Sequence, residues 1–238
     1  MFVAINNMCT TGAINLNGFI LFKTRDPVAG MIFADEVRIV RDKIKKLIVS
    51  NNDGMYGGIN DLGVGIVATY VKVRAGQIPY LVDDYIEQIL EAKTAKEATK
   101  IIESFNPPIG GNIIVADENS SFVIECGPDE LIAKEVKDKV IRTNHFLNLP
   151  YQSIFYKDSK FKKWTETRFS RATKLLRNVK NIKDIKSLLK DHEGYPDISI
   201  CNHGKIPTGS AFIINTEKRE ILHCEGNPCE SKFKKYNF

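Results

Sequence analysis

The sequence predicts an α+β domain built from stacked layers of sheet and helix. Two groups of strand-like segments occur along the 238 residues, and each group is accompanied by one long helical pattern. A sheet has one apolar face to bury and a helix one apolar stripe, so such elements stack in layers around a shared core. With 43% hydrophobic and 26% charged residues, the composition is that of an ordinary globular domain, and we expect a single domain over residues 1–238.

The first strand group occupies the N-terminal third of the chain. Its segments are short, rich in Val, Ile and Phe, and separated by Asn, Gly or Asp. Asn17-Gly18 predicts a two-residue hairpin because both residues tolerate the positive φ of a type I′ turn. Asn52-Asp53-Gly54 predicts a second turn. The predicted strands are 2–5, 12–16, 19–22, 36–40, 46–49 and 64–71.

Helical periodicity then replaces the strand pattern. Between residues 83 and 105, apolar residues recur every three or four positions, and Pro107-Pro108 ends the pattern. A second helical stretch covers about 166–190. The second strand group lies between the two helical stretches, and a final hairpin follows. These predicted strands are 112–116, 121–126, 131–134, 139–142, 210–215 and 220–225.

Charge and apolar content argue against several classes of function. The formal charge is +5, much of it in lysine-rich segments around 157–163 and 232–235, which we interpret as solvated faces and not as a nucleic-acid surface. No apolar run approaches the length of a membrane span. The N-terminal residues do not resemble a signal peptide. We therefore expect a cytoplasmic protein with reduced thiols and with no membrane or nucleic-acid partner.

The five cysteines do not predict a disulfide framework, because their number is odd. Several lie close to histidines in the C-terminal sequence, but the spacings Cys-x-His and His-Cys-x4-Cys match no common zinc pattern. We therefore expect no metal and no organic cofactor. The residues concerned are Cys201, His203, His223, Cys224 and Cys229.

Short motifs in a fixed order indicate a family. Met8-Cys9-Thr10-Thr11 precedes a predicted hairpin that ends in Phe22-Lys23-Thr24-Arg25-Asp26. Together with later segments, this resembles the choloylglycine hydrolase and penicillin V acylase family and the related acyl-coenzyme A:isopenicillin N acyltransferases. Lys23 and Thr24 stand where that family commonly holds Arg or Asn. The later segments are Gly58-Ile59-Asn60-Asp61-Leu62-Gly63, Gly111-Asn112 through Ala116-Asp117, Val123-Ile124-Glu125, Thr143-Asn144-His145-Phe146, Thr167-Arg168-Phe169-Ser170-Arg171, Ile200-Cys201-Asn202-His203 and Gly226-Asn227-Pro228-Cys229.

The resemblance implies the N-terminal nucleophile (Ntn) hydrolase fold. That fold is a four-layer αββα sandwich with two antiparallel sheets between helix layers. It also implies a cysteine enzyme that cleaves the nonpeptide C–N amide bond of an N-acyl small molecule through a thioester at Cys9. Two alternatives stay open: an acyltransferase that passes the acyl group to an amine, and a catalytically silent binding protein of the same fold. Relatives act on bile salts, penicillins and other N-acyl compounds and often form dimers or tetramers.

Each implied site residue has a chemical reason. A thiol with a pKa near ~8.5 can give its proton to its own α-amino group, whose pKa is near ~7.7–8.0, if Cys9 is the N-terminal residue. The resemblance implies that Asp26 orients this amine or thiol. Asn144, supported by Asn60, would donate to the oxyanion. Arg168 would favour the thiolate and fix Asp26. The role of Arg25 stays open.

Simpler interpretations stand beside these roles. Cys9 alone reads as a small buried thiol, and Asp26 as a strand-end residue. Asn60 and Asn144 are also common turn residues, and His145 is expected to support the fold and not to act as a base. The substrate-binding residues are not determined, with loop position alone suggesting Phe33 and Tyr56.

The mechanism requires that residues 1–8 be removed to expose the amine of Cys9. In one route the precursor cleaves itself, with Cys9 attacking the preceding carbonyl carbon. In the other, translation starts at Met8, and ordinary methionine removal exposes Cys9 because cysteine is small. Both routes stay open at this point.

Overall fold

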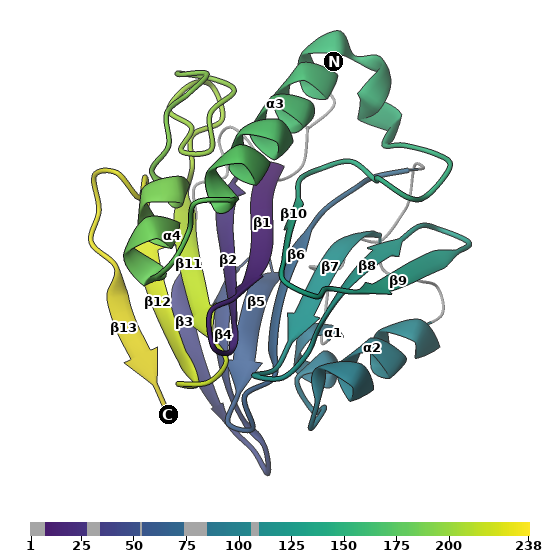
Figure 1. The fold of residues 1–238 in the computed structure, drawn as a ribbon, viewed down its shortest axis with the longest axis vertical. Coiled ribbons are helices and arrows are strands. Elements are labelled where there is room, and N and C mark those ends of the chain that lie inside the picture. The colour runs from purple at the N-terminus through teal and green to yellow at the C-terminus, as the bar shows by residue number, and fades with distance from the viewer. Residues whose placement is uncertain (1–7, 28–33, 53, 74–84, 106–109) are drawn as a thin grey trace.

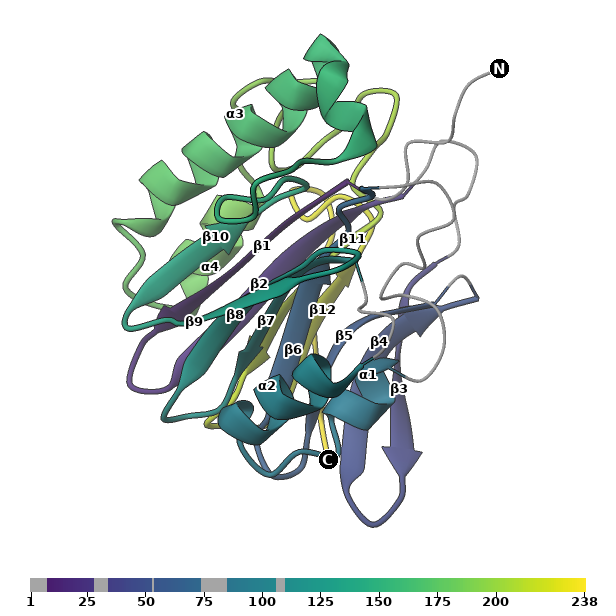
Figure 2. The same cartoon turned by 90° about the vertical axis from the view of Figure 1, so that its right-hand side faces the viewer.

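The computed structural model describes residues 8–27, 34–52, 54–73, 85–105 and 110–238 (Figure 1). The predicted strand 2–5, Phe33 and the Pro107-Pro108 stop lie outside these residues. The described chain forms two antiparallel sheets packed face to face, with helices on both outer sides (Figure 2). This confirms the predicted α+β sandwich.

The first sheet contains both ends of the described chain. Its strand order is β10-β1-β2-β11-β12-β13, and every described pair is antiparallel. Asn15 pairs with Phe19, so β1 and β2 are joined by the three residues 16–18, one more than the predicted two-residue turn. Asn17 and Gly18 both have positive φ values, 59° and 126°, as their residue types predicted. The strands are β1 (Met8–Asn15), β2 (Phe19–Asp26), β10 (Lys139–Arg142), β11 (Ser210–Asn215), β12 (Glu220–Glu225) and β13 (Lys234–Asn237).

The second sheet is formed by the middle of the chain. Its order is β3-β4-β5-β6-β7-β8-β9, so each strand lies beside its neighbours in sequence. β5 was not predicted, because its glycines weaken the strand pattern in the sequence. The strands are β3 (Glu36–Arg41), β4 (Lys45–Asn51), β5 (Gly54–Asn60), β6 (Gly65–Thr69), β7 (Gly111–Ala116), β8 (Ser121–Cys126) and β9 (Leu131–Glu135).

The helices form the two outer layers. α1 (Tyr85–Ile89) and α2 (Ala95–Ser104) pack on the second sheet, and α3 (Ser159–Leu176) and α4 (Ile182–Leu189) pack on the first. Each predicted helical stretch is in fact two helices. Thr94 and Asn181 explain the breaks, since each caps the N-terminus of the following helix by accepting from a backbone N–H.

Two apolar cores hold the layers together. The larger one fills the space between the sheets and beneath α1 and α2, and the smaller one lies between the first sheet and α3 with α4. β2 is buried along its whole length although it carries Lys23, Arg25 and Asp26. Charged groups in a buried strand are costly unless they are paired, so the charged half of this strand marks a candidate functional region.

Candidate active site

The start of β1 and the end of β2 bring the first two predicted residues together. Cys9 lies opposite Arg25, and Met8 lies opposite Asp26 in the antiparallel register. Side chains alternate between the faces of a strand. Cys9 and Arg25 therefore face the second sheet, whereas Asp26 faces α3.

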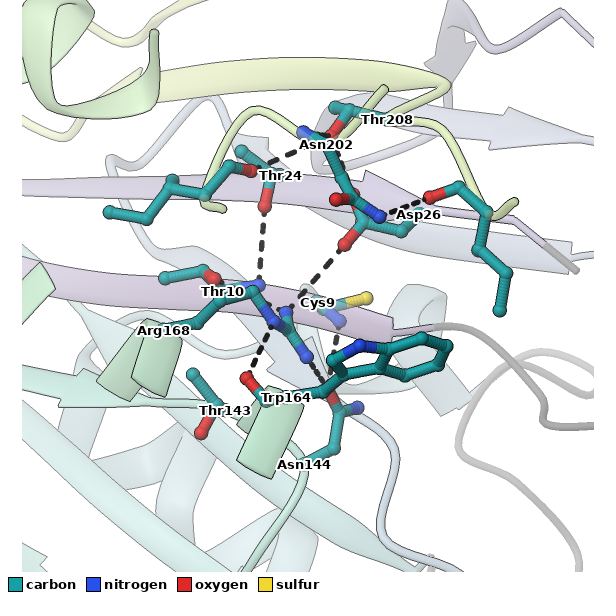
Figure 3. A network of polar contacts seen from close by, with 12 residues as sticks. Cys9, Thr10, Thr24, Asp26, Thr143, Asn144, Trp164, Arg168, Asn202 and Thr208 are labelled. Atoms are coloured by element: carbon teal, nitrogen blue, oxygen red, sulfur yellow. Dashed lines mark hydrogen bonds and ion pairs between the residues drawn. The ribbon is translucent and has the colours of Figure 1, made fainter. Parts of the chain in front are cut away.

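Asn144 follows β10 and holds the backbone of Cys9. Its side-chain oxygen accepts from the Cys9 amide nitrogen at 2.9 Å and from Arg168 Nη2 at 3.0 Å. Its side-chain nitrogen donates to the Tyr70 carbonyl oxygen at 2.9 Å, and its backbone nitrogen donates to Thr165 Oγ1. The Asn144 amide is thus fixed between both sheets and α3, beside Cys9 (Figure 3).

Arg168 connects this amide to Asp26. It lies on α3 with its side chain 2% exposed, and its Nη1 is 3.6 Å from Asp26 Oδ2 and donates to Thr10 Oγ1 at 3.3 Å. Thr208 donates to Asp26 Oδ1 at 2.7 Å. Burial raises the pKa of Asp26 to about 6, although Arg168 and the Thr208 hydrogen bond oppose the increase. Figure 3 shows Asp26 between Arg168 and Thr208.

Lys23 and Arg25 place two further cations near the thiol. Lys23 Nζ donates to the Ala68 carbonyl oxygen at 2.6 Å, and Arg25 Nε lies 2.6 Å from Asp35 Oδ2. Burial raises the pKa of the Cys9 thiol, whereas Lys23 opposes that rise. Burial likewise lowers the pKa of Lys23, while charge attraction and a hydrogen bond with Cys9 act in the opposite direction.

Lys23 was not among the predicted site residues. The sequence signal is a pair of cations, Lys23 and Arg25, at alternating positions directly after the apolar run that ends at Phe22. Tyr56, suggested only from loop position, lies under the Arg25 guanidinium, 4.5 Å from the ring centroid. Its backbone carbonyl oxygen accepts from Lys23 Nζ at 3.3 Å. Tyr56 is therefore buried beside the cations that surround the thiol.

Asn60 does not join this group, which corrects its predicted supporting role. Its amide nitrogen donates to the Leu90 and Ala92 carbonyl oxygens, and its oxygen accepts from two backbone N–H groups in its own turn. The turn packs near Thr216, which bonds Phe19 at the far end of β1 and β2. That end is the length of β1, roughly 20 Å, from Cys9. Asn60 therefore stabilises a turn.

His145 is placed to support the fold. Its Nδ1 lies 3.1 Å from Thr143 Oγ1 and 2.9 Å from Thr165 Oγ1. Burial lowers its pKa to about 4, so the ring is neutral at physiological pH. Met8 lies on the opposite face of β1 from Cys9 and packs in an apolar cluster with Phe161 and Ile206.

Residues 17–228 match the family model of the acyl-coenzyme A:6-aminopenicillanic acid acyl-transferases. The chain belongs to this family. Family membership makes the protein an enzyme of the acylase or acyltransferase class, as the motif order predicted. No curated protein matches the sequence significantly. Among the described residues, no helix is both long and apolar enough to cross a membrane.

Solved structures show the same fold at low identity. Penicillin V acylase from Agrobacterium tumefaciens is 12% identical with a TM-score of 0.59, over 91% of this chain and 82% of its own. A mutant conjugated bile acid hydrolase from Clostridium perfringens is 12% identical with a TM-score of 0.58, over 97% of each chain. The N-acylethanolamine-hydrolyzing acid amidase orthologue of Caenorhabditis elegans is 14% identical with a TM-score of 0.60, over 87% and 93%. These similarities confirm the Ntn fold.

Proposed function

We propose that the protein is a cysteine amidohydrolase that cleaves the nonpeptide amide bond of an N-acyl small molecule through a thioester at Cys9. The observation that carries this proposal is one buried network. Asn144 accepts from the Cys9 backbone nitrogen and from Arg168, and Arg168 also faces Asp26. A nucleophile, an amide donor and a carboxylate are thereby held on three elements that pack together.

Removal of residues 1–8 turns the Cys9 amide nitrogen into an α-amino group in the same place. Asp26 Oδ2 is suited to accept a hydrogen bond from this amine, because the oxygen is buried and makes no hydrogen bond among the described residues. The nearest cation, Arg168 Nη1, is 3.6 Å from it. Asn144 already accepts from the Cys9 nitrogen. The new amine would therefore have two oxygen acceptors that fix its orientation.

The reaction then needs no cofactor. The α-amine takes the thiol proton, and the sulfur attacks the substrate carbonyl carbon. Asn144 donates to the oxyanion that forms. When the intermediate collapses, the C–N bond breaks and the leaving amine takes the proton from the Cys9 ammonium. Water, deprotonated by the same amine, attacks the thioester and releases the carboxylic acid and the free thiol.

Local charge supports this chemistry. Lys23, Arg25 and Arg168 place three cations around Cys9, against the carboxylates of Asp26 and Asp35. The excess of positive charge favours the thiolate and the oxyanion in a region from which water is excluded.

Intact mass spectrometry of protein expressed from a reading frame that contains both Met1 and Met8 tests the proposal and separates the two routes to the free amine. We expect the active protein to begin at Cys9. If cleavage is autocatalytic, Cys9→Ala retains residues 1–8. If translation starts at Met8, Cys9→Ala still begins at position 9, because alanine also permits methionine removal. Amide hydrolysis by a chain that retains Met1 would refute the proposal.

Alkylation provides a second readout. Iodoacetamide should abolish hydrolysis in step with modification of Cys9, whereas Cys126→Ala, which removes another fully buried thiol, should leave the stoichiometry of inactivation unchanged. Adding a primary amine tests the acyltransferase alternative. A new amide product formed at the expense of the free acid would favour acyl transfer, and unchanged acid release would favour hydrolysis.

A further inference from the structure

Two histidines and two cysteines meet at the surface away from Cys9. His192, Cys201, His203 and Cys229 each offer one ligand atom, and these four atoms all lie within 4.8 Å of one another. His192 and His203 are 11 positions apart, whereas Cys201 and Cys229 are separated by 28. The group therefore assembles only in the folded chain, from the loop after α4 and the segment after β12.

Two of the four separations given below match those of a tetrahedral metal site, and the other two are about 0.1–0.2 Å shorter. A zinc ion with Zn–S near 2.3 Å and Zn–N near 2.0–2.1 Å holds its ligand atoms roughly 3.3–3.8 Å apart. Here the two sulfur atoms are 3.5 Å apart, and the two Nε2 atoms are 3.1 Å apart. His203 Nε2 lies 3.5 Å from Cys201 Sγ and 3.2 Å from Cys229 Sγ.

Groups around the cluster support metal binding. The Glu230 carboxylate lies 3.8 Å from Nδ1 of His203, on the side of the ring opposite to the cluster. At this distance the carboxylate makes no hydrogen bond to the ring, and it contributes a nearby negative charge that favours a bound cation. Asn227 Nδ2 donates to Cys201 Sγ at 3.7 Å, as a donor to a thiolate does. His192 is exposed, so a metal ion has access to the cluster from solvent.

The fold fixes the ligands through backbone hydrogen bonds. The Cys201 amide nitrogen donates to the Asp191 carbonyl oxygen at 2.9 Å, and Asp191 is held by Arg171 in an ion pair of 2.7 Å. The His203 amide nitrogen donates to the Pro196 carbonyl oxygen. The ligand-bearing loop is therefore ordered by contacts that do not depend on the ligand atoms themselves.

We propose that His192, Cys201, His203 and Cys229 bind one structural zinc ion. Two thiolates and two imidazoles in tetrahedral array are the donor set that zinc prefers. All four positions are filled by protein atoms, so the ion has no open position for a substrate, and its role is to hold the loop after α4 to the segment after β12.

This site differs from what the spacing along the sequence indicated. The candidate ligands predicted from the sequence included His223 and Cys224, which are not part of the cluster, and did not include His192.

Hydrogen bonds connect the proposed zinc site to the Cys9 site. Asn202 lies in the sequence between the ligands Cys201 and His203. Its side-chain nitrogen donates to the Ile206 carbonyl oxygen, and its backbone nitrogen donates to Thr208 Oγ1, which in turn donates to Asp26.

Metal analysis of the purified full chain tests the proposal. We expect zinc to copurify in equimolar amount when the expression medium contains zinc. Replacement by cobalt should produce the absorption bands of a tetrahedral thiolate-bound ion. His192→Asn, which changes an exposed side chain, should reduce zinc affinity by roughly tenfold or more while the chain still folds. Glu230→Ala should fold as well and reduce affinity by less than His192→Asn does, because the exposed Glu230 carboxylate makes no hydrogen bond to His203.

Cys224→Ala is the matched control, because this buried cysteine lies on the neighbouring strand outside the cluster. It should retain zinc. A folded protein that takes up no zinc or cobalt would overturn the proposal, and so would zinc retention by both His192→Asn and Cys229→Ser. A mass showing a Cys201–Cys229 disulfide in protein purified without oxidants would also overturn it, since the pair would then be a crosslink.

Discussion

The pKa of Asp26 gives the site a measurable effect on stability. Burial raises it from an ordinary value of 3.8 to about 6. Above pH 6 the carboxyl is ionised in both the folded and the unfolded chain, and the folded chain bears the full cost of the buried charge. Between about pH 4 and pH 6 the folded chain binds the proton and the unfolded chain does not, so this cost is relieved as the pH falls. The difference corresponds to about 3 kcal/mol.

Asp26→Asn removes the charge and keeps an oxygen that can accept from Thr208. The wild type gains stability as its folded carboxyl binds a proton and the variant does not, so we expect the stability of the full-length variant relative to the wild type to fall by about 2 kcal/mol between pH 7 and pH 4. Urea unfolding of both proteins, followed by circular dichroism over a pH series, measures this difference in the free energy of unfolding. Intact mass must show that residues 1–8 are present in both proteins.

Glu125→Gln is a control, because the pKa of Glu125 is shifted in the direction opposite to that of Asp26. Hydrogen bonds from the Asn148 and Leu149 backbone and the charge of Arg142 hold the pKa of Glu125 below its ordinary value despite burial. Its ionised form therefore stabilises the folded chain, and the variant should be less stable than the wild type at pH 7, with the gap closing as the pH falls. A difference between Asp26→Asn and the wild type that stays constant from pH 4 to 7 would refute the raised pKa.

Three further variants test the network. Arg168→Met leaves Asp26 without its cation and should lower the free energy of unfolding by about 3–5 kcal/mol, measured in urea, together with loss of hydrolysis. Lys23→Met removes a cation beside Cys9, so the pKa of the thiol should rise and alkylation at neutral pH should slow by about tenfold; an unchanged pH profile of alkylation would count against this contact. Asn60→Ala removes four hydrogen bonds from its turn and should cost about 2–4 kcal/mol of stability with unchanged kcat/KM. A fall in kcat/KM of roughly 100-fold would return Asn60 to the oxyanion.

The fold was predictable where local chemistry is strong. Asn17-Gly18 specified the first hairpin, and the Pro, Gly and Asn signals separated most of the remaining strands. Helix breaks were missed because the apolar period continues across them, although Thr94 and Asn181 each have the polar side chain of an N-cap. Which strands pair across a long connection, such as β2 with β11, depends on tertiary packing and leaves no local signal.

The site was predictable only in part, for a similar reason. Motif order indicated Cys9, Asp26, Asn144 and Arg168, which the structure brings together. Asn60 lies in a motif of the same kind, but its side chain satisfies backbone groups of a turn. The four residues of the proposed zinc site are separated by up to 37 positions, from His192 to Cys229, so their geometry is visible only in three dimensions.

The central claim is that Cys9 carries the acyl group. Rapid quenching of the enzyme with excess N-acyl amide substrate, followed by mass spectrometry of its peptides, tests this claim most directly. We predict a peptide that begins at Cys9 and bears the acyl mass, present during turnover, absent after substrate is consumed and absent in Cys9→Ala. Turnover in which Cys9 remains unmodified at every time point, together with undiminished hydrolysis by Cys9→Ala, would contradict the proposed mechanism.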